Sequence, residues 1–365
     1  MAADVQWYKV GDPYTTIQAA VNAALAAAPP GGVVYIPRGE WPLSLKITLP
    51  ASNPGVELTL RGDGPNATIV KTIQPGTDLL EVQRSRVRIE GIAFMGPFEN
   101  HGGYGRGIIV GGGVEDVVIR DCLVRWTGSY ALLFPSPSLS PTRRVLVERS
   151  VLARPDVNGP GLVYIGSGIK EVEFRDCIID YYGNSTAVEL NGCEDIAFYN
   201  TAIEPSNGGG AFIVANNAVS CRVIDDWLEE PAVASVINWM IDLGPGCRGW
   251  TILGNYFVRQ ATTDGTLKIM RIGDLASAAT GVIAASPRVR VTNGVTPTPG
   301  DVHIRNASTE ACLFDGFYDL GASILPMTVL DDSDRSIWMM PRSSRPPRVD
   351  DSEPAPRRLR IPVLD

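Results

Sequence analysis

A repeated pattern of short apolar segments in the middle of the chain constrains the fold more than any other feature. Each copy has a short alternating segment, one small or polar residue, and a second short apolar segment, and copies recur about every 24–30 residues. This period is typical of solenoids, and alternation with a period of two predicts strands rather than helices. The first inward residues of the copies are Val87, Val117, Val145, Val172, Ile196, Cys221 and Trp250. We therefore predict a β-solenoid in which each copy forms one coil.

The small or polar residue inside each copy is predicted to form a bend, because Gly, Asn and Asp tolerate left-handed backbone. These bend residues are Gly91, Asp121, Arg149, Asp176, Asn200, Asp225 and Gly254. The outward side chains just before them alternate in charge, which predicts ion pairs between coils; they are Glu90, Arg120, Glu148 and Arg175. Asp121 and Asp176 also suit a catalytic pair, but the bends explain both without further assumptions.

Composition excludes several classes of function. The chain has 365 residues, 44% of them hydrophobic, and a net charge of −8, which argues against a nucleic-acid-binding protein. No apolar run approaches the roughly 20 residues of a membrane span. The N-terminal residues lack the basic start and apolar core of a signal peptide, so we expect synthesis in a cytoplasm.

The N-terminal residues carry the most specific motif. A predicted helix from Tyr14 places Ile17, Ala20, Val21, Ala24 and Leu25 on one face, and a glycine turn and a strand follow. Such a helix would cover the open end of a solenoid, which otherwise exposes unpaired strand edges. With its Ile-Gln-Ala-Ala, Gly-Val-Val-Tyr-Ile-Pro, Gly39 and Trp41, this stretch resembles the N-terminal cap of the pectate-lyase-like parallel β-helix superfamily.

The resemblance covers roughly residues 10–316 and implies an all-β, right-handed parallel β-helix with an N-terminal capping helix and an extended C-terminal arm. We predict a cap at residues 1–50, the β-helix at 51–320 and the arm at 321–365. The superfamily includes phage tailspikes, polysaccharide lyases and glycosidases. One fold with many chemistries specifies no single activity.

The strand that lines the groove in the enzymes of this superfamily is the place to look for chemistry. Its outward residues are predicted to include Ile109, Leu133, Tyr164, Glu189 and Ile213. A glycosidase needs two carboxylates, and Glu189 has the loop residues Asp156 and Asp180 as candidate catalytic partners. The four other residues form an apolar strip, for which contact with a partner subunit is the alternative.

No metal or cofactor is expected, since the two histidines, His101 and His303, lie far apart and the six cysteines lack metal-ligand spacing. We expect the cysteines to be small buried thiols. Four tryptophans are candidates for stacking on sugars: Trp126, Trp227, Trp239 and Trp250. The repeat alignment places Trp227 and Trp250 at inward positions, which favours a core role for both.

The C-terminal segment is rich in proline and arginine, a composition typical of an extended segment without a core. We predict that it is ordered by contact with the acidic body, a sister subunit or a larger assembly. The arginines assigned to such contacts are Arg342, Arg345, Arg348, Arg357, Arg358 and Arg360.

Two hypotheses of function follow. The first is a bacteriophage virion structural protein: a β-helical spike, fibre or decoration subunit, expected to be a trimer located in the virion. It would contact other virion proteins through its arm and bind a host surface polysaccharide. The alternative is a polysaccharide depolymerase, either a tailspike-type glycosidase or a pectate-type lyase. A spike that grips glycan without cutting it lies between the two.

Overall fold

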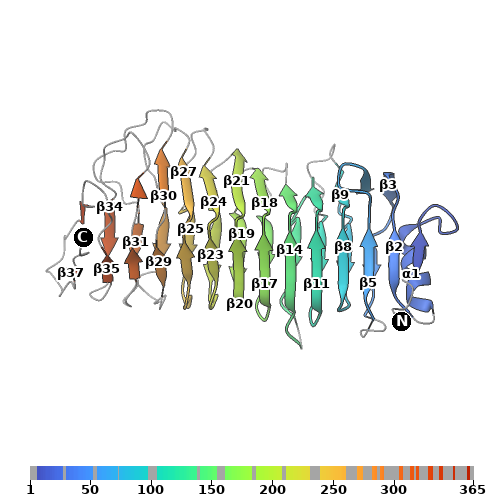
Figure 1. Ribbon diagram of the computed structural model, residues 1–365, viewed down its shortest axis with the longest axis horizontal. Helices are drawn as coiled ribbons and strands as arrows, with labels where there is room; N and C mark the ends of the chain where they lie inside the picture. The colour runs from blue at the N-terminus through green and yellow to red at the C-terminus, as the bar shows by residue number, and fades with distance from the viewer. Residues whose placement is uncertain are drawn as a thin grey trace. The chain divides into compact units, whose positions relative to one another are not determined.

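The predicted repeats form successive coils, and the described strands of these coils make three parallel sheets. The computed structural model describes residues 6–27, 30–51, 56–72, 74–97, 105–137, 140–153, 161–182, 186–207, 211–230, 239–259, 269–273, 282–285, 288–291 and short strands beyond them. The chain divides into two units, residues 1–179 and 180–365. In each unit a coil contributes one strand to sheet 1, one to sheet 2 after the bend, and one to sheet 3 (Figure 1).

In the first unit, neighbouring strands within each sheet are parallel. Sheet 1 contains β1 (Trp7–Lys9), β2 (Gly32–Tyr35), β5 (Leu58–Arg61), β8 (Val87–Glu90), β11 (Glu115–Arg120), β14 (Arg143–Glu148) and β17 (Lys170–Arg175). Sheet 2 contains β3 (Gly39–Leu43), β6 (Thr68–Thr72), β9 (Ala93–Met95), β12 (Leu123–Arg125) and β15 (Val151–Ala153). Sheet 3 contains β4 (Ile47–Leu49), β7 (Leu80–Val82), β10 (Ile108–Val110), β13 (Leu132–Phe134) and β16 (Gly161–Ile165).

The second unit repeats this arrangement, and β18 (Ile178–Tyr182) begins just before its boundary. Its sheet 1 contains β20 (Glu194–Tyr199), β23 (Arg222–Ile224), β26 (Thr251–Leu253), β29 (Ile283–Ala285), β32 (Leu313–Asp315), β35 (Ile337–Met339) and β37 (Arg360–Ile361). Sheet 2 contains β21 (Ala202–Asn207), β24 (Trp227–Glu230), β27 (Tyr256–Arg259), β30 (Arg288–Val291) and β33 (Tyr318–Asp319). Sheet 3 contains β19 (Thr186–Asn191), β22 (Ile213–Asn216), β25 (Ile241–Leu243), β28 (Met270–Ile272), β31 (Ile304–Asn306), β34 (Thr328–Asp331) and β36 (Arg348–Val349). Each unit is a parallel β-solenoid, as predicted.

The core lies between the three sheets, and the predicted inward residues occupy it. All seven are at most 2% exposed. Val117 pairs in register with Val87 on one side and Val145 on the other, and Val145 pairs with Val172. Similar apolar residues stack in successive coils and form a buried column. Removal of this apolar surface from water is the main favourable contribution to the free energy of folding. The five cysteines that the structure describes are free and buried, as predicted.

The predicted bends are confirmed in every repeat. All seven bend residues have left-handed backbone, with φ between 44° at Arg149 and 67° at Gly254. A second left-handed position, which the sequence analysis missed, directly precedes each inward residue. It is occupied by Arg86, Asp116, Arg144, Glu171, Asp195, Ser220 and Gly249. In β11, β14, β17 and β20 this left-handed residue is the second residue of the strand, and in the other coils it directly precedes the strand or its first inward residue.

Ion pairs connect coils along the outside of sheet 1. The alternating charges predicted such pairs, and the pair between Arg120 and Glu148 confirms this. Nε of Arg120 lies 2.8 Å from a Glu148 carboxylate oxygen. The bend residues extend this network, because Arg149 donates two hydrogen bonds to Asp121 at 2.9 and 3.0 Å. Arg175, which pairs in register with Glu148, also contacts Glu173 of its own strand, at 2.5 Å.

Helix α1 (Ile17–Ala26) forms where predicted, and its buried residues are the five expected on one face. Thr16 caps its N-terminus by accepting a hydrogen bond from the Ala19 amide at 3.1 Å. The Gln18 side chain joins the helix to β4, because its amide bonds both the N–H and the C=O of Thr48, at 2.8 and 3.0 Å. The role of this helix as an end cap, and the boundaries at residues 50 and 320, stay predictions.

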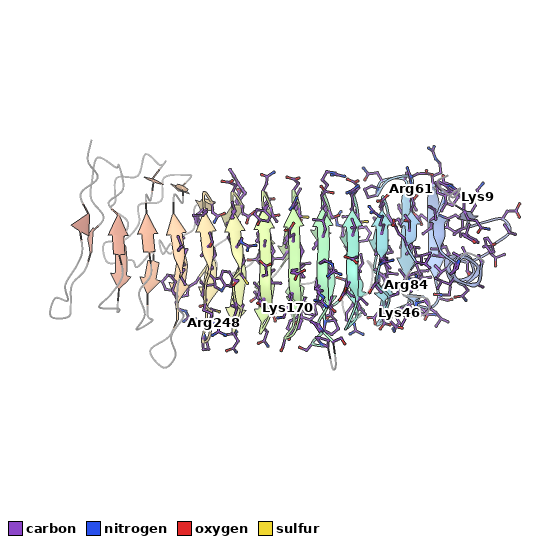
Figure 2. The ribbon with its side chains drawn as sticks, turned by 60° about the horizontal axis from the view of Figure 1, so that its bottom comes forward. Lys9, Lys46, Arg61, Arg84, Lys170 and Arg248 are labelled. Carbon is purple, nitrogen blue, oxygen red and sulfur yellow. The ribbon has the colours of Figure 1, made fainter. Side chains whose placement is uncertain are left out.

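A buried cation, Arg84, lies inside the first unit (Figure 2) and is 1% exposed. Its guanidinium donates a hydrogen bond to the Val56 carbonyl at 2.6 Å. Removal from water lowers the pKa of this guanidinium.

The predicted C-terminal arm is described only in part. Arg348 and Arg360 lie in β36 and β37, whose backbones pair with β34 and β35. Arg342, Arg345, Arg357 and Arg358 lie outside the described residues. Within the part of the chain that the structure describes, no helix is long and apolar enough to cross a membrane.

Candidate functional site

The predicted groove residues of sheet 3 form a row only in part. Ile109 pairs with Leu133, and Leu133 with Tyr164, so these three are in register. Ile109 and Leu133 are only 5% and 7% exposed, and the expected open apolar strip is therefore not present at these positions. Tyr164 is half-buried, and its ring centroid lies 5.4 Å from that of Tyr130.

The prediction for Ile213 is wrong. Ile213 pairs with the inward residue Val188 and is fully buried, whereas Val214 pairs with Glu189 and shares its row. Counting from the repeat placed the strand one residue out of register, and a shift of one residue moves a side chain to the opposite face.

Glu189 and its expected partner Asp180 lie on strands of different sheets. Glu189 lies on β19 in sheet 3, in a row that continues through Val214 to Asp242. Asp242 pairs with Arg271, with contacts of 2.8 and 2.5 Å. Asp180 lies on β18, where its charge acts on Glu204 of sheet 2, and Asp156 lies outside the described residues.

Sheet 2 of the second unit carries a different group of carboxylates, which we call the carboxylate row: Asp180, Glu204 and Glu229. Ile203 pairs with Leu228, both fully buried, and Glu204 and Glu229 follow directly in β21 and β24. The two glutamates therefore stand side by side on the outer face of neighbouring strands, whose backbones are about 4.8 Å apart.

The environment of Glu204 favours its protonated form. Burial raises the pKa of the Glu204 carboxyl, and the charges of Glu229 and Asp180 raise it further. Carboxylates in one site commonly divide the roles of acid and base because their environments move their pKa values apart. Glu204 is thus suited to donate a proton beside a second carboxylate.

Trp227 lies on the same face, which corrects the prediction of a core position. Its side chain is 37% exposed, and its indole N–H donates a hydrogen bond to Glu229 Oε2 at 2.6 Å. The inward position of this coil belongs instead to Asp226, which is 1% exposed. The prediction for Trp250 is confirmed: it is fully buried, and its N–H donates to the Ala218 carbonyl at 3.0 Å.

A sequence signal for the carboxylate row existed and was missed. Each member is the fourth residue after a predicted bend residue, namely Asp176, Asn200 or Asp225. The alignment that located the bends therefore places all three carboxylates in one row. Among the described residues no group of three or more His, Cys, Asp or Glu is placed to hold a metal ion.

Comparisons with known proteins bear on the fold. No protein-family model matches the chain, and no curated protein is similar to it. Among solved structures, the alginate lyase from Paenibacillus sp. str. FPU-7 has a TM-score of 0.54 at 11% identity, covering 88% of this chain and 97% of that one. The A-module of the Azotobacter vinelandii mannuronan C-5 epimerase AlgE4 has a TM-score of 0.54 at 17% identity, covering 88% and 94%.

A viral protein has the same fold. The chain called Geobacillus virus E2 ORF18 has a TM-score of 0.52 at 14% identity over 88% of this chain. This chain spans 57% of the length of that viral protein. At these identities the likeness concerns the fold alone, and it confirms the predicted parallel β-helix fold.

Proposed function

We propose that the protein binds a polysaccharide on sheet 2 of the second unit and hydrolyses it at the carboxylate row. The observation that carries this proposal is the pairing of Glu204 and Glu229 on neighbouring strands, beside the exposed ring of Trp227. A retaining glycosidase needs two carboxyl groups about 5–5.5 Å apart, and neighbouring strands supply a spacing of about 4.8 Å.

The two glutamates have distinct roles in this proposal. Glu204, whose pKa is raised by burial and by its acidic neighbours, protonates the glycosidic oxygen as the bond to the sugar breaks. Glu229 attacks the anomeric carbon, and a water molecule deprotonated by Glu204 then releases the sugar. Asp180 acts through its charge, which helps to keep the proton on Glu204.

Trp227 supplies the binding surface. The flat ring offers an apolar platform for the C–H face of a sugar, as aromatic side chains do at sites that are partly apolar and partly wet. Its hydrogen bond to Glu229 also holds the ring and the carboxylate in one arrangement. The sugar unit on the ring would thus lie next to the proposed nucleophile.

The test compares single amide variants on a panel of purified polysaccharides that includes a neutral glucan, alginate, pectin and bacterial capsule. Reducing-end release reports hydrolysis, and ultraviolet absorbance of unsaturated ends reports lyase chemistry. We expect hydrolysis by the wild type, loss in Glu204→Gln and Glu229→Gln, and retention in Glu189→Gln. If Glu189→Gln alone lost hydrolysis, the active site would lie on sheet 3 and the proposal would be wrong.

A structural role in a virion is the second candidate, supported by the fold shared with a viral protein and by the arginine-rich C-terminal segment. In this proposal the protein is a trimeric spike, fibre or decoration subunit in the virion. Sheet 2 grips host glycan without cutting it, and Arg342, Arg345 and the arginines after them contact other virion proteins. Light scattering measures the oligomeric state, and binding and product-release assays measure the action on glycan. A trimer that binds glycan but releases no product would favour this candidate, and a monomer that releases product would exclude it.

A further inference from the structure

A row of buried polar side chains runs through the interior of each unit, at the residue directly after the bends from Asp121 to Gly254. We call it the interior polar row. In the first unit it consists of Cys122, Ser150 and Cys177, and in the second of Thr201, Asp226 and Asn255; each is at most 1% exposed. Polar groups in such a position must find hydrogen-bond partners inside the solenoid.

Three members of the row reach an equivalent backbone carbonyl of the preceding coil. The acceptor is the carbonyl three residues before the row position of the preceding coil. Asn255 Nδ2 donates to the Val223 carbonyl at 2.8 Å. The thiols of Cys177 and Cys122 lie 3.4 and 3.5 Å from the equivalent carbonyls of Val147 and Ile89. Each thiol is also within hydrogen-bond distance of a carbonyl of its own coil, that of Arg175 at 3.3 Å and that of Arg120 at 3.2 Å.

Ser150 and Thr201 donate instead to carbonyls of their own coils, those of Glu148 and Tyr199, at 2.9 and 3.3 Å. The side chains at this place thus act as donors to backbone carbonyls, and an ionised carboxylate has no proton to donate.

Asp226 occupies the place of an asparagine in this row. Asn255 Oδ1 accepts a hydrogen bond from the Asp226 amide at 2.8 Å, and Asp226 Oδ1 accepts one from the Thr201 amide at 2.6 Å. In both side chains Oδ1 thus accepts a hydrogen bond from the backbone amide of the row residue in the preceding coil. The second oxygen of Asp226 stands where Asn255 has its NH₂ group, and the equivalent carbonyl is that of Phe198, which pairs with Val223.

The surroundings of Asp226 contain little to stabilise a negative charge. Oδ2 is buried and has no hydrogen-bond partner among the described residues. The neighbouring coils present neutral groups, Thr201 and Asn255, and the titratable group that acts on Asp226 is Asp225 of the same bend. Burial, and then the Asp225 charge, raise the pKa of the Asp226 carboxyl well above its ordinary value, although the amides of Thr201 and Ile224 oppose this.

We propose that Asp226 is held as the neutral carboxylic acid, with a proton on Oδ2 that is donated to the Phe198 carbonyl, so that folding of the second unit depends on this proton. The acid then donates to the carbonyl equivalent to the one that Asn255 reaches one coil later. This inference does not depend on the proposed function. It also affects the proposed site, because Thr201 and Asp226 directly precede β21 and β24, which carry Glu204 and Glu229.

The sign of the pH dependence follows from linkage. In the unfolded chain Asp226 loses its proton near pH ~3.9, whereas the folded chain keeps it to a higher pH. Above pH ~3.9 the native state therefore binds one more proton, and its stability falls as the pH rises until the raised pKa is passed. Over that window the unfolding equilibrium constant grows by about tenfold per pH unit from this group alone.

Asp226→Asn in the full chain tests the proposal, with Asp225→Asn as the matched control. Asparagine carries the required donor at every pH, so we expect Asp226→Asn to be more stable than wild type above pH ~4, by a factor that widens with pH. Asp225 is exposed, and Asp225→Asn should keep most of the wild-type slope. Denaturant unfolding at a series of pH values measures the slope.

Two results would overturn the proposal. One is an Asp226→Asn variant that keeps the wild-type pH slope, loses stability at neutral pH, or fails to fold, because asparagine would then not fit the place. The other comes from infrared spectroscopy of the folded wild type at neutral pH. A protonated-carboxyl band that disappears in Asp226→Asn supports the proposal, and the absence of such a band refutes it.

Discussion

Sheet 2 carries different side chains at equivalent positions of the two units. At the fourth residue after each bend the first unit has Met95, Arg125 and Ala153, which are paired in register. The second unit has Asp180, Glu204 and Glu229 at the equivalent positions. Arg125 lies over the ring of Trp126, at 5.1 Å from its centroid, whereas Trp227 donates a hydrogen bond to Glu229.

This difference teaches that the solenoid fixes positions and leaves their chemistry open. The inward residues and the bends must be similar in every coil because they build the core and the turns. The outward residues contact solvent, so each coil is free to carry a charge, an apolar side chain or an aromatic ring. A local cluster such as the carboxylate row is therefore informative about function in a way that the core is not.

The largest expected effect is the loss of polysaccharide hydrolysis when Glu204 of the second unit is replaced. Glu204→Gln should lower kcat/KM by about 10²–10⁴-fold, the usual contribution of general acid catalysis. Because the acid must be protonated, and burial and charge raise the pKa of Glu204, activity of the wild type should persist to a higher pH than an ordinary glutamate allows and then fall. The pH–rate profile of both proteins measures this.

Arg125→Gln is the control for that experiment, since it removes a charge at the equivalent position of the first unit. We expect its pH–rate profile to match the wild type. A comparable loss of activity in Arg125→Gln would show that sheet 2 of the first unit takes part, and the contrast between the units would fail.

The next effect is a difference in stability loss between variants of the buried Trp250 and the partly exposed Trp227. Trp250→Ala should lower the free energy of unfolding by about 3–5 kcal/mol, because it leaves a large cavity in the core. Trp227→Ala should cost much less stability, since the ring is 37% exposed, but should weaken binding of the polysaccharide. Urea unfolding and equilibrium glycan binding measure the two effects, and equal losses of stability would contradict the assignment.

A smaller effect tests whether bends are equivalent between the units. Gly91→Ala should cost about 1–2 kcal/mol, because a residue with a Cβ is strained at a φ of 66° and the new atom would lie 3.0 Å from the Gly62 carbonyl oxygen. Gly254→Ala, at a φ of 67°, should have the same sign. Denaturation midpoints check both variants, and a stabilised Gly91→Ala would refute the argument.

The smallest expected effect concerns the ion pairs between coils. Arg120→Ala in the first unit and Arg222→Ala in the second, which removes a 2.7 Å contact with Asp195, should each cost at most about 1 kcal/mol. Both losses should shrink in about 1 M salt, which screens partly exposed charges. Thermal unfolding at low and high salt measures this; a loss that salt does not change would point to packing of the arginine stem instead.

The sequence by itself determined the features that depend on neighbouring residues along the chain. The repeat predicted the strands, the buried residues from Val87 to Trp250 and the bends, and the helical spacing of the N-terminal motif predicted the apolar face of α1; all of these are confirmed. Period-two alternation, a helical face and a left-handed bend are local properties, which a stretch of a few residues specifies.

Only the tertiary structure decided how residues of different coils align. It placed Val214 rather than Ile213 beside Glu189, and put Asp226 inside and Trp227 outside. Repeat lengths vary from coil to coil, so counting from one coil does not fix the register of the next, and a shift of one residue reverses the face of a strand. The register is set by the three-dimensional stacking of the coils, in which buried side chains, turns and hydrogen bonds of neighbouring coils must fit at the same time.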